Sequence, residues 1–381
     1  MKPVTTPTLL ATFVIAAVAG AGLGRAAGFA PGHLAVLRAG DGAVDLHLKQ
    51  APVFIDQFDA GSFNAAPAYT VSIPTNGPEA LFFNGHAATE GMLARSGDHR
   101  LLTFAGYGGV NLLQSNGTPA LLDIKRAFGT VDAAGTAHTT FYRSHGGGDL
   151  KMNPRGVVTD GNNNFWGCGN SLGTVFYHPE GAAEPVIFAG IASTRAIRIV
   201  NNVVYTALNG PDGTTSDLAA GIFSFTDAAG NATPPPRSAD AKLKLEVKAQ
   251  TPYVKNAGFD VNPAGTVAYI ADTAAGIQKY VKTDGANGTW KFAYNFTIPQ
   301  NIPAEQNHLA GCFGLVADFS GPAPVIYATT TEGWDGSVNS NRVVRIVDTN
   351  ATAQVTTIVQ AGSTNIAYRG IDFTPAATAA K

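Results

Sequence analysis

The segment 257–280 constrains the fold of this 381-residue chain more than any other feature, because weaker copies of it recur along the sequence. It contains a short apolar strand, a turn at 263–265, a second apolar strand ending at Asp272 and a third strand at 277–280. One such unit cannot bury both faces of its own sheet. Its recurrence therefore predicts similar small sheets that pack side by side around a ring.

Six phrases share the opening of this segment, in which a residue of variable type precedes Gly or Ala and an apolar strand. They begin at Glu90, Arg155, Arg195, Ala257, Phe313 and Arg369. The last phrase stands alone near the C-terminus, whereas residues 33–73 contain strands without an opening phrase. We therefore predict an all-β chain that forms a single β-propeller of six blades, in which the C-terminal strand joins the N-terminal blade and leaves no open edge. Because roughly 60 residues per unit is long for a blade, a seventh blade within 106–150 or 209–254 is an alternative.

The N-terminal residues 1–26 have the pattern of a signal peptide. Lys2 precedes an apolar run at 9–24, and small residues at 24–26 suit a cleavage site. A membrane anchor is the alternative, but the run is short and Gly-rich for a span. We expect residues 27–381 to be the propeller domain of a secreted or periplasmic protein, with no membrane span in the mature chain.

The composition narrows the classes of partner. Charged residues make up 14% of the chain, the net charge is −2 and no basic run exists, which argues against nucleic-acid binding. Cys168 and Cys312 are 144 positions apart and belong to no zinc-binding motif. They are either a disulfide of an exported protein or two buried free thiols. We expect a monomer.

The segment 257–280 resembles a blade of the NHL-repeat type of β-propeller, and fainter echoes occur at 314–318 and 370–372. The matching residues are Gly258, Asp260, Pro263, Gly265, Tyr269, Ala271, Asp272, Ile277, Gln278 and Tyr280. This resemblance extends to the group that holds streptogramin lyases and SMP-30-type lactonases. It implies a propeller but not one activity, because one architecture serves many functions.

The repeat alignment also predicts a binding site. The residue before each innermost strand should lie at one mouth of the central channel, and four of these residues are charged: Glu90, Arg155, Arg195 and Arg369. Three Arg side chains at one opening would attract the carboxylate, sulfate or phosphate group of a small anion or an acidic glycan. The alternative is that these Arg side chains bind loop carbonyls and pair with Glu90, so that they hold neighbouring blades in register.

Two histidines are weak candidates for catalysis, because both belong to loops that could overhang this mouth. His145 lies in a Gly-rich loop and His308 precedes the strand at Phe313, so either could act as a general base, with Tyr142 or Tyr368 as an acid. Exposed loop histidines without a role are the alternative.

No serine nucleophile elbow is present, and no cofactor is expected. A structural Ca²⁺ in the turn at 159–164 is the alternative to an ordinary β-turn.

These observations predict an exported propeller that binds a glycan, a small anion or a protein at one face of its channel. A carbohydrate-active lyase or lactonase that uses the Arg-lined mouth and a loop His is the first alternative. A structural protein of the envelope or matrix is the second.

Overall fold

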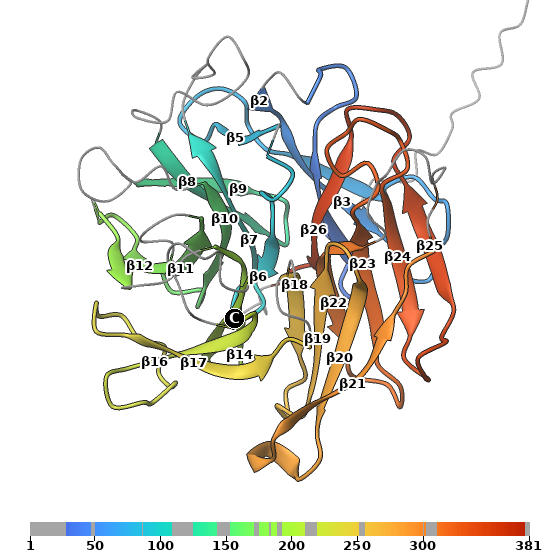
Figure 1. Ribbon diagram of the computed structural model, residues 1–381. Coiled ribbons are helices and arrows are strands. Elements are labelled where there is room, and N and C mark those ends of the chain that lie inside the picture. The colour runs from blue at the N-terminus through green and yellow to red at the C-terminus, as the bar shows by residue number, and fades with distance from the viewer. Residues whose placement is uncertain are drawn as a thin grey trace, which may run out of the picture.

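The computed structural model describes residues 28–377 apart from 47–49, 86, 109–124, 143–152, 171–174, 183, 189–192, 210–218, 251–255, 300 and 302–310. Within these residues the chain is almost entirely β-structure, arranged as six sheets around a central channel. This confirms the predicted six-bladed β-propeller. In Figure 1 the innermost strands lie toward the middle of the ring and the outer strands surround them.

We number the blades along the chain and give their strands from the inside outward. Blade 1 contains β26 (Ala367–Phe373), β1 (Leu34–Ala39), β3 (Val53–Phe58) and β4 (Tyr69–Ser72). Blade 2 contains β6 (Leu93–Arg95), β7 (Leu101–Gly108), β8 (Lys125–Asp132) and β9 (Ala137–Tyr142), with β5 (Leu81–Asn84) also paired to β7 and β2 (Gln50–Ala51) paired to β5. Blade 3 contains β10 (Pro154–Thr159), β11 (Asn164–Gly169), β12 (Val175–Pro179) and β13 (Val186–Phe188).

The other three blades each have four strands in simple order. Blade 4 contains β14 (Thr194–Val200), β15 (Val203–Leu208), β16 (Gly221–Thr226) and β17 (Lys242–Lys248). Blade 5 contains β18 (Asn256–Val261), β19 (Val267–Asp272), β20 (Gly276–Lys282) and β21 (Trp290–Phe296), with a short 3₁₀ helix at Gly285–Asn287. Blade 6 contains β22 (Cys312–Asp318), β23 (Val325–Thr330), β24 (Arg342–Val347) and β25 (Val355–Gln360).

The ring closes as predicted, through the C-terminal strand. β26 pairs with β1 in antiparallel register from Leu34 opposite Phe373 to Ala39 opposite Ala367. The described parts of 106–150 and 209–254, where a seventh blade was the alternative, belong to blades 2 and 4.

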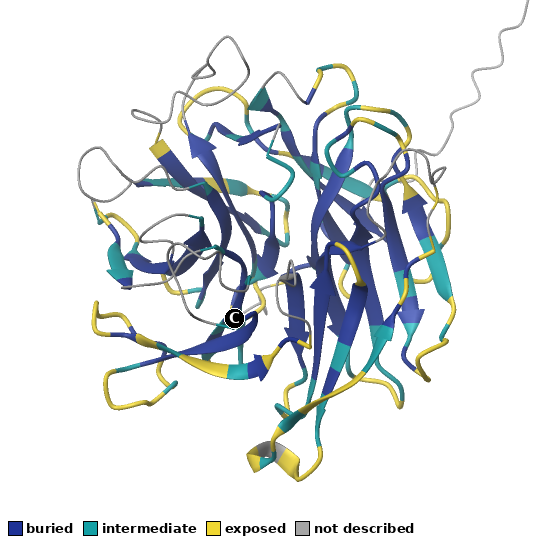
Figure 2. Ribbon diagram, viewed as in Figure 1, coloured by how far each residue is buried: buried dark blue, intermediate teal, exposed yellow. Residues whose placement is uncertain are grey.

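The hydrophobic core is divided among the six interfaces between neighbouring blades. On β19, for example, Ala268 and Ile270 pack toward blade 4, whereas Tyr269 and Ala271 pack toward blade 6. Both faces of a central strand are therefore buried, which explains why these strands are apolar at successive positions. In Figure 2 the inner strands are buried along their length and the outer strands β17 and β21 carry the exposed residues.

The recurring sequence, with Gly or Ala at its second position, forms a bulge in the inner strand at the channel. The pairing register shifts inside the phrase in the inner strands of blades 1, 3, 4, 5 and 6, as expected for a β-bulge. A Cβ atom on Gly258 would lie 2.6 Å from the amide nitrogen of Leu315, and one on Gly370 would lie 2.3 Å from that of Leu93. Glycine is thus needed because the inner strands of adjacent blades approach closely there.

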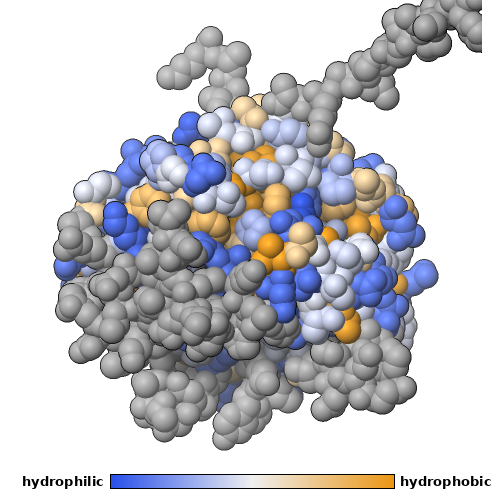
Figure 3. All heavy atoms as spheres, turned by 90° about the horizontal axis from the view of Figure 1, so that it is seen from above, coloured by the Kyte–Doolittle hydropathy of each residue, from blue (hydrophilic) through white to orange (hydrophobic). Residues whose placement is uncertain are grey.

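The described residues contain no helix that is both long and apolar enough to cross a membrane. From above, the coloured part of the surface shows small polar and apolar areas side by side (Figure 3).

Candidate functional site

We call the end of the channel formed by the starts of the inner strands the entry mouth, and the opposite end the exit mouth. The six residues that open the repeated phrases lie at the entry mouth, one from each blade. In order around the ring from blade 1 to blade 6 they are Arg369, Glu90, Arg155, Arg195, Ala257 and Phe313. The charged residues therefore occupy four successive blades and the apolar residues the other two.

Glu90 lies between two of the arginines and is completely buried. Its carboxylate accepts hydrogen bonds from the Tyr107 hydroxyl at 2.6 Å and from the Asn84 amide at 3.1 Å. Burial raises the pKa of Glu90 to about 7, although the charges of Arg369 and Arg155 act in the opposite direction. The structure thus places Glu90 close to Arg369 and Arg155.

Arg369 fits the structural alternative for this position. Its guanidinium donates to the carbonyl oxygens of Ala87 at 3.0 Å and Gly85 at 3.2 Å, and it lies 5.8 Å from the centre of the Phe83 ring. These contacts join blade 1 to the chain of blade 2. Arg369 is therefore occupied mainly in holding the ring together.

Arg155 and Arg195 are less well satisfied than Arg369, whose Nε is also without a partner among the described residues but whose other two nitrogen atoms donate to carbonyl groups. Arg155 donates one hydrogen bond, to the Thr194 carbonyl at 3.3 Å, and its Nε has no partner among the described residues. Arg195 is 8% exposed, and within the same part of the chain neither its Nε nor its Nη1 has a partner. Buried polar groups are nearly always hydrogen-bonded, so these two guanidinium groups need an explanation.

The pKa of Arg195 also indicates that the charged guanidinium groups of Arg155 and Arg195 are poorly stabilised. Burial and the nearby charge of Arg155 lower the pKa of Arg195 to about 9, and Asp272 only partly offsets them. One carboxylate oxygen of Asp272 already accepts the amides of Ala274 and Ala275. Among the described residues, the buried guanidinium groups of Arg155 and Arg195 therefore keep donor atoms without acceptors.

Apolar residues also belong to the entry mouth, besides Asp335, whose charge acts on Arg369. Phe313 packs edge-on against Trp334, with ring centres 5.4 Å apart, and Trp334 is half-buried. The mouth therefore combines an arc of arginines with an aromatic wall.

The structure gives no catalytic role to the tyrosines that were candidates, and the two candidate histidines are not described. His145 and His308 lie outside the described residues. Tyr142 is buried and stacked on Phe128 at 4.4 Å, and burial raises its pKa, as it raises the pKa of Tyr368 to about 12. Neither tyrosine is therefore adapted to give up a proton near neutral pH.

The cysteines take the simpler of their two interpretations, whereas a Ca²⁺ ion in the turn at 159–164 stays a prediction. Cys168 and Cys312 are buried free thiols, so the disulfide alternative is wrong. In the turn at 159–164 the Asp160 carboxylate accepts the amide of Asn162 at 2.7 Å, as in an ordinary β-turn. No cluster of three or more His, Cys, Asp or Glu with the arrangement of a metal site is found in the described part of the chain.

A second charged constellation, which the sequence did not predict, lies at the exit mouth. Arg198 of blade 4 crosses the channel: it forms an ion pair with Asp372 of blade 1, donates to the Leu315 carbonyl of blade 6 at 3.0 Å and lies 3.8 Å from Asp260 of blade 5. Arg95 of blade 2 lies 3.2 Å from the Asp372 carboxylate. Comparing the residues two positions after the Gly or Ala of each phrase would have found Arg198, Asp260 and Asp372.

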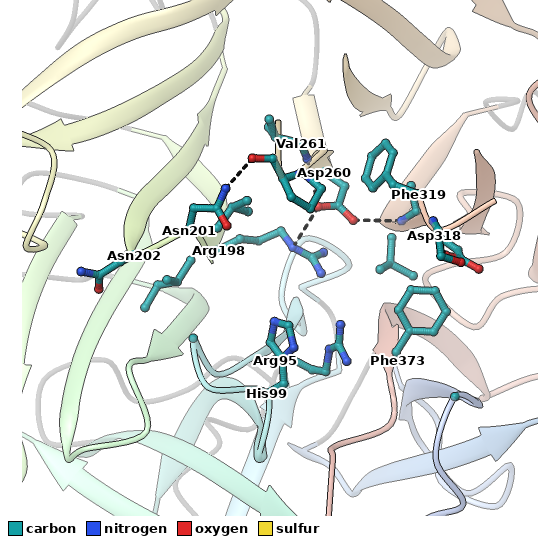
Figure 4. A pocket seen from close by; sticks show the side chains of 18 residues that line it. Arg95, His99, Arg198, Asn201, Asn202, Asp260, Val261, Asp318, Phe319 and Phe373 are labelled. Atoms are coloured by element: carbon teal, nitrogen blue, oxygen red, sulfur yellow. Dashed lines mark hydrogen bonds and ion pairs between the residues drawn. The ribbon is translucent and has the colours of Figure 1, made fainter. Parts of the chain in front are cut away.

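Arg95, Arg198 and Asp260 form the floor of a pocket of about 640 Å³ (Figure 4), and Asp372, the ion-pair partner of both arginines, is fully buried. The walls come from the turns and strand ends of several blades, including His99, Asn201, Phe319 and Phe373. The channel thus has two chemically different ends, separated by Arg198.

Comparisons with known proteins support the fold. No family model matches the chain, and neither does any curated protein sequence. A chain from the nidogen/laminin complex is 10% identical with a TM-score of 0.51, over 89% of this chain and 97% of that one. A proposed 6-phosphogluconolactonase from Bacteroides fragilis is 11% identical with a TM-score of 0.47, over 86% and 81%. A hypothetical selenium-binding protein from Sulfolobus tokodaii is 9% identical with a TM-score of 0.46, over 91% and 95%. At these identities the first similarity bears on the propeller fold alone, and the other two carry no further argument.

Proposed function

We propose that this protein is an exported propeller that binds a small anionic molecule at the entry mouth, with Arg155 and Arg195 holding the anionic group. The observation that carries the proposal is the pair of buried guanidinium groups whose Nε atoms, and the Nη1 of Arg195, have no acceptor among the described residues. Export rests on the apolar run at 9–24, and an NHL-type origin of the blades rests on the segment 257–280.

A carboxylate, sulfate or phosphate group would stabilise the two buried guanidinium groups in two ways. It supplies acceptor oxygens that match the planar donor fork of a guanidinium. It also offsets the mutual repulsion of two desolvated positive charges, which water cannot do in a buried site.

The neighbouring groups favour an anion that is attached to a larger ring. Trp334 provides a half-buried aromatic ring on the far side of the mouth, packed edge-on against the fully buried Phe313, and the uncharged part of a ligand can pack against it. An acidic sugar, with a carboxylate on one edge and a C–H face, combines both features.

Binding is favoured over the lyase or lactonase alternative. Catalysis of that kind needs a group that can take up a proton beside the arginines. Glu90 has a pKa in the useful range, but both of its carboxylate oxygens accept hydrogen bonds and the side chain is fully buried. It is therefore poorly placed to react with a ligand.

Isothermal titration calorimetry with sulfate and glucuronate, and with dimethyl sulfone as an uncharged control that is not a sugar, tests the proposal. We expect both anions to bind the wild-type protein and the double variant Arg155→Gln/Arg195→Gln to lose at least tenfold in affinity, because charge-assisted hydrogen bonds are worth roughly 1.5–3 kcal/mol each. Arg100→Gln, which changes an exposed arginine elsewhere, is the matched control. Unchanged affinity in the double variant would remove the entry mouth as the site.

A further inference from the structure

We propose that the exit-mouth pocket is a second binding site, and that its ligand is an uncharged sugar. This inference is independent of the entry mouth, because Arg198 and its partners lie between the two ends of the channel. The volume of about 640 Å³ is within the range of roughly 300–1,000 Å³ that is typical of small-molecule sites.

The floor of the pocket is charged but balanced. Arg198 and Arg95 face Asp260 and Asp372, and three ion-pair contacts join the four side chains. An anion would compete with two carboxylates for guanidinium groups that already have partners, and a cation would compete with the arginines. The floor therefore disfavours an anionic ligand, and the half-buried Asp318 on the pocket wall, whose carboxylate accepts the Ser320 amide at 2.9 Å, adds acceptor oxygens for hydroxyl groups.

The same floor offers donors and acceptors together. A sugar hydroxyl donates one hydrogen bond and accepts others, so it can bind between a carboxylate and a guanidinium without disturbing their balance. The Arg95 side chain is 25% exposed and its guanidinium lies 5.5 Å from the centre of the Phe373 ring, so its outer edge faces the pocket. Groups of both kinds are thus available at one surface.

His99 adds a neutral group at the rim. Burial and the charge of Arg95 lower its pKa, so the imidazole is uncharged at neutral pH and can both donate and accept. Its backbone is in the left-handed region with φ of 63°, and its carbonyl accepts the amide of Ala376 at 2.8 Å. This conformation holds the ring at the pocket, as Figure 4 shows.

Two aromatic rings complete the site on the opposite side. Phe319 of blade 6 is half-buried and lies parallel to Tyr269 at 5.9 Å, which fixes its plane. Phe373 of blade 1 packs edge-on against Tyr327 at 5.9 Å. Rigid ring faces beside convergent polar groups suit the C–H face of a pyranose, which is apolar while its edge carries hydroxyls.

The test is a saturation-transfer NMR and calorimetric screen of the full chain with glucose, galactose, mannose, N-acetylglucosamine, maltose and cellobiose. We expect at least one of them to bind, and His99→Gly and Phe319→Leu each to weaken it by roughly tenfold, the loss expected for one hydrogen bond or one ring contact. Glycine at position 99 accepts the positive φ, so the turn should keep its shape. Circular dichroism and urea unfolding verify that each variant is folded.

Asn163→Gly is the matched control, since Asn163 occupies the equivalent turn of blade 3 with φ of 64° and is not part of the pocket. Sulfate, an anion, and ammonium, a cation, serve as charged probes of the same variants. The proposal fails if no neutral sugar binds, if binding is unchanged in His99→Gly and Phe319→Leu, or if a charged probe binds in this pocket instead. Arg155→Gln/Arg195→Gln should leave sugar binding intact, so the two sites can fail separately.

Discussion

Arg195 and Arg198 lie three residues apart on β14, yet their surroundings are opposite. Arg198 faces the exit mouth, where an ion pair, a carbonyl and a second carboxylate receive its guanidinium. Arg195 faces the entry mouth, where two of its three nitrogen atoms have no partner among the described residues. Both side chains are largely buried, so the difference is one of partners rather than of exposure.

This contrast separates a structural charge from one that is available to a ligand. Arg198 contacts three other blades across the channel and so closes the ring from inside. Arg195 has a lowered pKa, which means that its charged form is less stable in the folded protein than in water. Arg369 also has a lowered pKa but donates two hydrogen bonds to carbonyl groups, so the missing partners of Arg195 are the reason to assign it to binding.

The largest expected effect comes from removing the two arginines separately. Arg198→Met should destabilise the fold by about 3–5 kcal/mol, because it leaves two buried carboxylates with too little compensation. Arg195→Met should be neutral or stabilising, because it removes a buried charge without a partner. Urea unfolding of both variants measures the difference.

The double variant Arg198→Met/Asp372→Asn is the control for this prediction. It removes a charge of each sign, so it should recover part of the loss. Equal destabilisation by Arg195→Met and Arg198→Met would contradict the distinction between the two mouths.

The fold was predictable from the sequence because a propeller repeats its local contacts. The Gly of the phrase is required where adjacent inner strands touch, as at Gly258 and Gly370, so the fold leaves a periodic trace in the chain. The orphan strand at 369–373 then implied closure, since it had no partner within its own repeat.

The pairing of charges was not predictable in the same way. Arg198 and Asp372 are 174 positions apart and meet only after six blades have closed into a ring. Likewise the spacing of Cys168 and Cys312 did not tell whether the two thiols meet. Repeat alignment finds equivalent positions, but it does not tell which side chains cross the channel.

The pH dependence of stability at Glu90 gives a second test of the difference between the charged residues of the entry mouth and those of the exit mouth. Its pKa is raised from the ordinary 4.5 to about 7 in the folded protein. Between pH 4.5 and pH 7 the folded protein therefore binds one more proton than the unfolded chain does. This contribution to the free energy of unfolding is fully present below pH 4.5 and is lost as the pH rises through 7, by about 3 kcal/mol in total. Glu90→Gln should lack this loss, as shown by urea unfolding from pH 5 to pH 8. An identical pH profile in the variant would mean that Glu90 is ionised throughout.

The smallest effect is expected at an exposed ion pair, Arg100 with Asp98, in the turn of blade 2 beside the exit mouth. The Arg100 side chain is 45% exposed, so water and salt screen its charge and hold its contribution below about 1 kcal/mol. Arg100→Ala should therefore cost less than that in low salt and almost nothing in high salt, whereas the cost of Arg198→Met should stay nearly constant. Urea unfolding of both variants at two salt concentrations makes the comparison. Burial of the side chain is our explanation for the different contributions of Arg100 and Arg198 to the free energy of unfolding. A large, salt-independent loss of this free energy in Arg100→Ala would contradict it.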